Sequence, residues 1–288
     1  MRVVGLGKVV SWNHVVFKLP DNWEVTSEGG SRFNGIIVAA PEKGGKLEIY
    51  WRRSSGKKYW REHERYVDKL VKRGFERRSR FKVSIKGHEA FEDVLINGNV
   101  KVFVTTWYCD ETNRLFIVQM DGEKVSQSIF SEVLNSINCH PGDKGVVDWR
   151  LMGIGLRLYT DYFLLDRIFK IGYSMAYFMS RDKKVHVIQY SIPKYVHSSI
   201  SFRAEDTWKR HAKMLIPKFT VLDLISRNNY STYIIRHRFI KSIKYGYLLS
   251  KIDECKKPNY IQYTLVKTDS KRLEEACSII GNTLCVEW

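Results

Sequence analysis

The stretch Trp60–Gly74, WREHERYVDKLVKRG, places a histidine three residues after a tryptophan, and the same pattern returns in WKRHAKML from Trp208. The first copy predicts an amphipathic helix over residues 57–73, ending before Gly74, with these residues on its apolar face: Trp60, His63, Val67, Leu70 and Val71. We interpret this WxxH pattern as a core anchor that is kept in both copies of one duplicated fold.

Other landmarks recur in the same order along the chain. Gly35 and Gly172 each open an apolar strand, and His88 and His237 follow the two WxxH segments. Each half then closes with two cysteines 30 residues apart, Cys109 with Cys139 and Cys255 with Cys285. Such order predicts a tandem duplication. We place the first repeat at residues 1–142 and the second at 146–288, joined by the turn-rich segment CHPGDKG.

Within each half, alternating apolar segments predict strands. Residues 100–108 and 114–120 are expected to form a hairpin, and closing helices are expected at about 123–138 and 269–280. Short turns between strands favour antiparallel pairing. The predicted fold class is therefore α+β: two tandem repeats, each a largely antiparallel β-sheet flanked by helices in an α/β/α sandwich.

The segment FKLPDNWEV from Phe17, followed by a Gly-led strand, a helix and a closing helix, resembles the PsbP/Mog-type α/β/α sandwich. The resemblance covers each half in outline. It implies a non-catalytic accessory or binding role, and it assigns no functional residue because no functional motif matches. The second half departs from the pattern, with Tyr159 where the first half has Pro20.

Composition favours an intracellular binding protein with an anionic partner. The 288 residues carry a net charge of +17, so the protein attracts polyanions. The most apolar stretch, residues 159–179, is interrupted by charged residues, and we expect no membrane partner. We also expect a cytoplasmic protein, since no export signal is present, and the composition leans towards a thermophilic source.

The positive charge is clustered, and aromatic residues are interspersed with it. Lys and Arg can neutralise phosphates while an exposed aromatic ring stacks on a base. The candidate phosphate contacts are Arg52, Arg53, Lys57, Lys58, Arg61, Arg65, Arg77, Arg78, Arg80, Arg236, Arg238, Lys241 and Lys244, with Trp51 and Tyr59 as candidate stacking residues.

These residues predict a non-enzymatic protein that contacts nucleic acid or a ribonucleoprotein without sequence specificity, because no base-reading motif is present. The alternative is a protein-interaction adaptor of PsbP/Mog type that holds an acidic partner. Catalytic motifs such as GxSxG, HExxH and the P-loop are lacking, so we assign no catalytic residue and expect no cofactor.

The histidines and cysteines leave three alternatives. Two of each per half could form a tetrahedral zinc site, but the C-x2-C and H-x3–5-H spacings are absent, so we assign no metal. Equal spacing favours disulfides Cys109–Cys139 and Cys255–Cys285, each closing a similar loop. The remaining alternative is that these thiols are free and buried.

Overall fold

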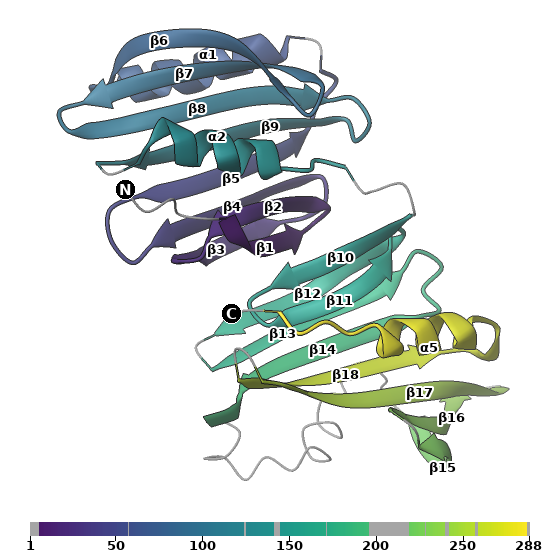
Figure 1. Cartoon of the computed structure of the whole chain (residues 1–288). Coiled ribbons are helices and arrows are strands. Elements are labelled where there is room, and N and C mark those ends of the chain that lie inside the picture. The colour runs from purple at the N-terminus through teal and green to yellow at the C-terminus, as the bar shows by residue number, and fades with distance from the viewer. Residues whose placement is uncertain are drawn as a thin grey trace. The chain divides into compact units, whose positions relative to one another are not determined.

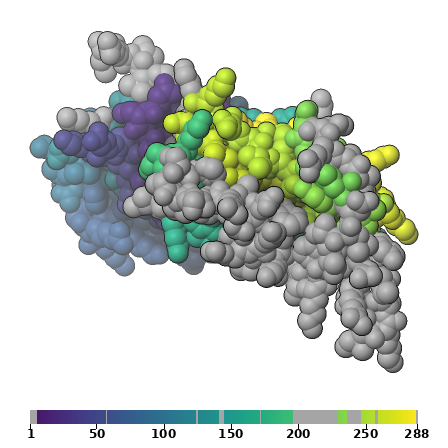
Figure 2. Space-filling view, turned by 90° about the horizontal axis from the view of Figure 1, so that it is seen from below, coloured from purple at the N-terminus to yellow at the C-terminus, as the bar shows by residue number. Residues whose placement is uncertain are grey.

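The computed structural model describes residues 6–56, 58–123, 125–140, 145–170, 172–195, 219–227, 229–239, 242–256 and 259–286, and Figures 1 and 2 draw the other residues in grey. The chain divides into two compact units, Met1–Gly142 (unit 1) and Asp143–Trp288 (unit 2). Of the second WxxH copy, Trp208 and His211 lie outside the described residues. No helix in the described part is long and apolar enough to cross a membrane.

Unit 1 has a two-stranded hairpin followed by a seven-stranded sheet with strand order β3-β4-β5-β9-β8-β7-β6. All neighbours in this sheet are antiparallel. Its elements are β1 (Leu6–Trp12), β2 (Val15–Pro20), β3 (Trp23–Gly30), β4 (Asn34–Pro41), β5 (Lys46–Arg53), α1 (Tyr59–Val71), β6 (Glu76–Ile85), β7 (His88–Asn97), β8 (Val100–Cys109), β9 (Arg114–Gly122) and α2 (Gln127–Ser136) (Figure 1).

Unit 2 has a hairpin and a seven-stranded antiparallel sheet with order β12-β13-β14-β18-β17-β16-β15. Its described elements are β10 (Val146–Leu151), β11 (Ile154–Tyr159), β12 (Tyr162–Lys170), β13 (Tyr173–Ser180), β14 (His186–Pro193), β15 (Phe219–Arg227), β16 (Ser231–Phe239), β17 (Ser242–Cys255), β18 (Tyr260–Thr268), the 3-10 turn η1 (Ser270–Arg272) and α5 (Leu273–Gly281). The strand order is the same as in unit 1, which supports the predicted duplication.

Tight turns explain why the strands pair with their neighbours. Asn13 and His14 both have positive φ between β1 and β2, and Lys86 and Gly87 do so between β6 and β7. Met152 and Gly153 take the same conformation between β10 and β11. Two positive-φ residues in a two-residue loop define the turn that matches the twist of antiparallel strands. The predicted hairpin of β8 and β9 is confirmed.

The two faces of the unit 1 sheet are covered by different elements (Figure 1). Val67 and Leu70 of α1 pack with Leu95, Val102 and Val104. Phe103, the neighbour of Val102 and Val104 on β8, points to the other face and stacks on Phe130 of α2 with ring centroids 5.3 Å apart. The β1–β2 hairpin lies beside α2 on that face, since Lys18 N–H donates to Ser136 Oγ at 2.9 Å.

The predicted α/β/α sandwich is wrong, because the protein is mainly antiparallel β-sheet. Only α1, α2 and α5 are α-helical in the described part, with 13, 10 and 9 residues. Five strands, β1 to β5, precede α1 in unit 1. The physical reason is that Leu6–Trp12 and Val15–Pro20 pair with each other as a hairpin, which lies beside α2 and so takes part of the covering that the prediction gave to helices alone.

The closing segment of unit 2 lies against β11 at Gly155. Leu284 N–H donates to the Gly155 carbonyl at 2.9 Å, and Gly155 N–H donates to Gln189 Oε1 at 2.6 Å. A Cβ at this position would overlap the backbone carbonyl oxygen of Leu284 and approach Val286 Cγ2 at 2.7 Å. Glycine is therefore required at position 155 by the close approach of two backbone segments.

We expect Gly155→Ala to lower the free energy of unfolding by about 1–3 kcal/mol, the usual cost of forcing extra volume into a packed site. Gly281→Ala is the matched control, because nothing lies within 4 Å of a Cβ built there and Gly281 ends a helix. It should leave stability within about 0.5 kcal/mol or raise it slightly. Denaturant unfolding measures both, and equal stabilities for the two variants would contradict the packing of the closing segment on β11.

Candidate functional site

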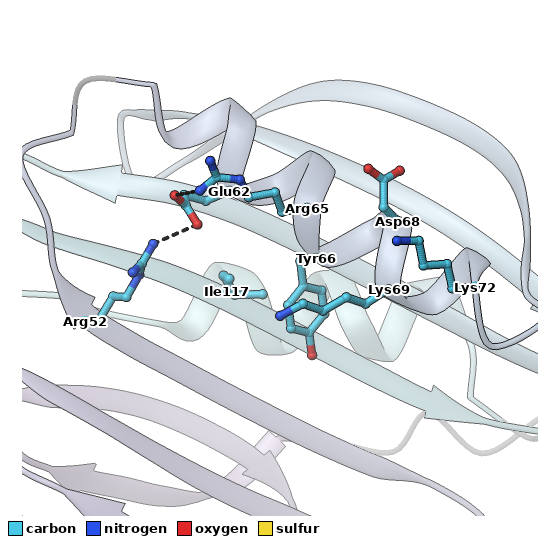
Figure 3. Close-up of a pocket in the computed structure, with 8 residues that line it drawn as sticks. All are labelled: Arg52, Glu62, Arg65, Tyr66, Asp68, Lys69, Lys72 and Ile117. Atoms are coloured by element: carbon cyan, nitrogen blue, oxygen red, sulfur yellow. Dashed lines mark hydrogen bonds and ion pairs between the residues drawn. The ribbon is translucent and has the colours of Figure 1, made fainter.

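A groove of about 550 Å³ runs beside α1 in unit 1 (Figure 3). Its lining combines four cations with two carboxylates and an apolar floor: Arg52, Arg65, Lys69, Lys72, Glu62, Asp68, Tyr66 and Ile117. Glu62 accepts from Arg52 at 2.8 Å and from Arg65 at 2.9 Å. Lys69 and Lys72 form no ion pair with any described residue, so two of the groove's cations are unpaired there.

Several of the predicted phosphate contacts are already paired with carboxylates. Arg77 Nη2 lies 3.0 Å from Glu64, and Arg77 Nε lies 3.0 Å from Asp93. Arg80 contacts the same two carboxylates, and Arg78 lies 2.9 Å from Glu76. These three arginines would have to give up protein partners before they could contact a phosphate.

Other predicted contacts are exposed. Lys58 precedes α1, and the Arg53 guanidinium lies over the Phe33 ring at 5.6 Å. The Arg61 guanidinium lies over the Trp60 ring at 5.1 Å. Trp60 is 46% exposed, so the interpretation of WxxH as a core anchor is wrong for the tryptophan and right only for the buried His63.

Neither predicted stacking residue is available for a base. Trp51 is buried at 2% exposure, and its Nε1–H donates to the Ser31 carbonyl at 2.9 Å. This corrects the prediction, because Trp51 is on a strand face that packs into the core. Tyr59 is half-buried against Phe91, and its hydroxyl donates to Glu89 at 2.8 Å.

The remaining predicted contacts, one from the first half and four from the second, lie outside the part of the chain whose side chains the structure describes. Lys57 and Lys241 lie outside the described residues. Arg236 and Arg238 belong to β16 and Lys244 to β17, and their side chains lie outside the described part.

A buried polar network links α1 to the sheet through Asp93, which is 0% exposed. His63 Nδ1 lies 2.9 Å from Thr106 Oγ1, and His63 Nε2 lies 3.4 Å from Asp93. Burial by itself would raise the pKa of Asp93, but His63, Arg80 and Arg77 together lower it to about 2. Asp93 is therefore ionised in the folded protein, and two arginines that the sequence assigned to phosphate binding stabilise its charge.

A second polar cluster joins three separate segments of unit 1: His88 begins β7, Cys109 ends β8, and Cys139 with His140 follow α2. One ligand atom from each of the four residues lies within 4.8 Å of the others. Cys139 Sγ is 3.4 Å from His88 Nε2 and 3.5 Å from His140 Nδ1, and Cys109 Sγ is 3.7 Å from His140 Nδ1. The sequence spacing had led us to assign no metal here.

The two thiols of this cluster are not equivalent. The Cys139 thiol donates to Cys109, which lowers the pKa of Cys109 and raises that of Cys139. The second ring nitrogens of the histidines face carboxylates, since His88 Nδ1 lies 3.6 Å from Asp110 and His140 Nε2 lies 3.4 Å from Glu111.

Cys255 and Cys285 of unit 2 are joined by a disulfide, as we had hypothesised for both pairs. The hypothesis is wrong for unit 1, where Cys109 and Cys139 are buried free thiols. The histidine correspondence also fails, because His237 lies near the end of β16 and pairs with Lys244, whereas His88 is the first residue of β7. Unit 2 has Val286 where His140 follows Cys139 in unit 1.

Comparison with known proteins gives little further information. The chain matches no protein-family model and no curated protein sequence. Two solved structures of TplEi, a T6SS immunity protein from Pseudomonas aeruginosa, resemble it with a TM-score of 0.32 each. The structure complexed with "L" peptide is 7% identical, and the match covers 97% of this chain and 98% of the TplEi chain. The apo structure is 8% identical, and the match covers 97% of each chain. These values are too low to assign a shared fold or function, and the PsbP/Mog resemblance stays a prediction.

The Asp93 network predicts a specific acid sensitivity. Because the folded-state pKa of Asp93 is about 2, below its ordinary value of 3.8, its ionisation stabilises the fold above about pH 4, and this contribution is lost as pH falls towards 2. The contribution is about 2 kcal/mol. Asp93→Asn should lower stability at pH 7 by about 3 kcal/mol, since it leaves buried partners uncompensated, and should show a flatter decline of unfolding free energy between pH 4 and 2.

Glu76→Gln is the control for the Asp93 variant, because Glu76 is exposed and pairs only with Arg78 among the described residues. Unfolding free energies of both variants and the parent chain are compared across that pH range. Parallel pH profiles for Asp93→Asn and the parent chain would show that Asp93 is not the titrating group.

The Cys255–Cys285 disulfide closes a loop of 30 residues, which predicts a contribution of about 3 kcal/mol to stability. We expect the double variant Cys255→Ala/Cys285→Ala to be less stable than the parent chain by this amount in the absence of reductant. With reductant the two proteins should converge. Cys277→Ser, which removes a free thiol, controls for loss of a cysteine alone; a parent chain whose stability is insensitive to reductant would rule out the bond.

Proposed function

We propose that this chain is a non-enzymatic binding protein and that the groove beside α1 holds an acidic segment of a partner protein. The observation that carries the proposal is the pair of lysines, Lys69 and Lys72, which line the groove without an ion-pair partner in the described part. Arg52 and Arg65 add two cations that share a single carboxylate, Glu62. The groove therefore has an excess of positive charge available to an incoming carboxylate.

The floor of the groove favours a protein segment over a nucleic acid. Tyr66 donates its hydroxyl to Gln119 at 2.9 Å and tilts against Tyr50, with ring centroids 6.3 Å apart, so its ring is held in place within the groove (Figure 3). With Ile117 it offers apolar surface to an aliphatic or aromatic side chain. A segment that alternates acidic and apolar residues would match both features.

A nucleic acid is the second candidate, supported by the net charge of +17 and the exposed Arg53, Lys58 and Arg61. We favour it less for two reasons. Trp51 is buried and Tyr59 is engaged with Glu89, so neither predicted stacking residue is free. Arg77, Arg78 and Arg80 are paired with carboxylates, which interrupts a continuous phosphate-binding face.

The test compares three labelled probes with the full chain by fluorescence anisotropy: a peptide of alternating Glu and Leu, a single-stranded RNA and a duplex DNA. We expect the acidic peptide to bind, and Lys69→Glu/Lys72→Glu to weaken its affinity about tenfold or more, since two surface charge contacts are replaced by repulsion. Lys18→Glu/Lys101→Glu makes the same charge change at two exposed lysines outside the groove lining and should leave affinity within about twofold.

Equal losses in the two double variants would show that net charge, and not the groove, attracts the peptide. Tighter binding of RNA or DNA, with a loss of several orders of magnitude between about 50 and 200 mM salt, would favour the nucleic-acid candidate.

A further inference from the structure

We infer that His88, Cys109, Cys139 and His140 form a structural zinc site in unit 1. The four ligand atoms lie within 4.8 Å of one another, and both cysteines are buried. Two thiolates and two imidazoles are one of the ligand sets that structural Zn²⁺ sites use. These soft and borderline ligands select against Mg²⁺ and Ca²⁺, which bind oxygen.

The separations between the ligand atoms fit a single tetrahedral ion. With Zn–S of about 2.3 Å and Zn–N of about 2.0–2.1 Å, a tetrahedron places sulfur and nitrogen about 3.6 Å apart. Three of the four sulfur–nitrogen separations in the cluster are 3.4, 3.5 and 3.7 Å, and the fourth, between Cys109 and His88, is within 4.8 Å. An ion can therefore be placed at the centre with little movement of the side chains. Four protein ligands would complete the coordination, which is the arrangement of a structural site.

The groups behind the histidines also match a zinc site. His88 directs Nε2 to Cys139 and Nδ1 to Asp110, while His140 directs Nδ1 to the thiols and Nε2 to Glu111. Each imidazole thus has one nitrogen in the cluster and the other near a carboxylate. This is the arrangement by which zinc proteins fix the orientation and tautomer of histidine ligands.

Rigid elements hold the ligands in place. His88 and Cys109 are the terminal residues of two paired strands, β7 and β8. Next to Cys139, Asn138 exchanges two backbone hydrogen bonds with Val16 at 3.0 and 2.7 Å, and Arg114 donates to the Cys139 carbonyl. Ligands positioned by strands and backbone pairing need little reorganisation to bind an ion.

Comparison of the two units argues against a disulfide as the natural state of the unit 1 cysteines. Cys255 ends β17 and Cys285 follows α5, so they occupy the positions that Cys109 and Cys139 have in unit 1. In unit 2 the two cysteines, Cys255 and Cys285, are joined by a disulfide. At the end of unit 2, Val286 stands where unit 1 has His140, and its described part has no four-residue cluster of this kind. Among the described residues, histidines accompany the cysteines only in the unit where the thiols are free.

The first experiment measures zinc in the full chain, purified with reductant and then dialysed, by plasma mass spectrometry. We expect about one zinc per chain, and replacement by Co²⁺ should give the thiolate charge-transfer band and the intense visible bands of tetrahedral cobalt. Added zinc should also raise the midpoint of thermal unfolding of the metal-free chain by about 5 °C or more, since it binds only the folded state.

Matched variants locate the site. Cys109→Ser and His140→Gln should each weaken zinc binding by about 100-fold or more. Even the loss of a group that only hydrogen-bonds to a zinc ligand lowers metal affinity by about 10–100-fold. Cys277→Ser and His186→Gln change the same residue types outside the cluster and should leave affinity within about twofold.

Three results would overturn the inference: no zinc taken up from an equimolar solution, uptake that Cys109→Ser leaves unchanged, or a Cys109–Cys139 disulfide in protein purified with zinc present. The cobalt spectrum is measured on the parent chain, so it tests the site even if a variant does not fold. Metal binding is measured without the acidic peptide, so the zinc site and peptide binding in the groove are tested independently.

Discussion

The packing of unit 1 depends on one buried cation, the guanidinium of Arg114, which is 1% exposed. It donates to a hydroxyl and four carbonyls from four separate segments: Thr112, Asn13, His14, Arg32 and Cys139. Burial lowers the pKa of Arg114 to about 10, so the group stays charged at neutral pH. Because an unsatisfied buried charge costs several kcal/mol, the turns that supply these carbonyls must all be in place when Arg114 is buried. This requirement ties the β1–β2, β3–β4 and β8–β9 turns to the segment that follows α2.

Unit 2 fixes the equivalent junction with neutral groups. Arg114 faces Cys109 across the β8–β9 turn, and Tyr260 faces Cys255 across the β17–β18 turn. The Tyr260 hydroxyl accepts from Val286 N–H, and Gln262 Nε2 donates to the carbonyls of Gly153 at 2.7 Å and Leu284 at 2.9 Å. Both units thus join the first hairpin turn to the closing segment through side chains at the start of β9 or β18. A neutral arrangement needs no buried counter-charge, and a covalent bond between Cys255 and Cys285 holds the same junction.

Local periodicity predicted the elements of this fold better than their assembly. The α1 helix and the β8–β9 hairpin follow from apolar spacing within a single segment. The prediction of an α/β/α sandwich was wrong because no local signal shows that residues 6–20 form a separate hairpin. Local sequence did not show that Arg77 and Arg80 pair with Asp93, which lies opposite Arg80 in the β6–β7 hairpin. It also did not show that Trp51 is buried, because the face on which Trp51 lies depends on its neighbours in the sheet. The His–Cys cluster comes from three segments with no short spacing; its one sequence signal is the unequal repeat, Cys139–His140 against Cys285–Val286.

The His–Cys cluster and the groove of unit 1 lie on different elements, but hydrogen bonds connect residues next to the cluster with both walls of the groove. His88 is followed directly by Glu89, which accepts from Tyr59 at the first turn of α1, the helix that forms one wall of the groove. On the other wall, Ser54 N–H just after β5 donates to the Asn113 carbonyl at 2.9 Å in the turn between Cys109 and Arg114. Both walls are therefore bonded to residues within a few positions of the cluster. Closing the cluster with an ion would restrain His88 and Cys109, and through these two contacts it would also restrain the spacing of α1 and β5.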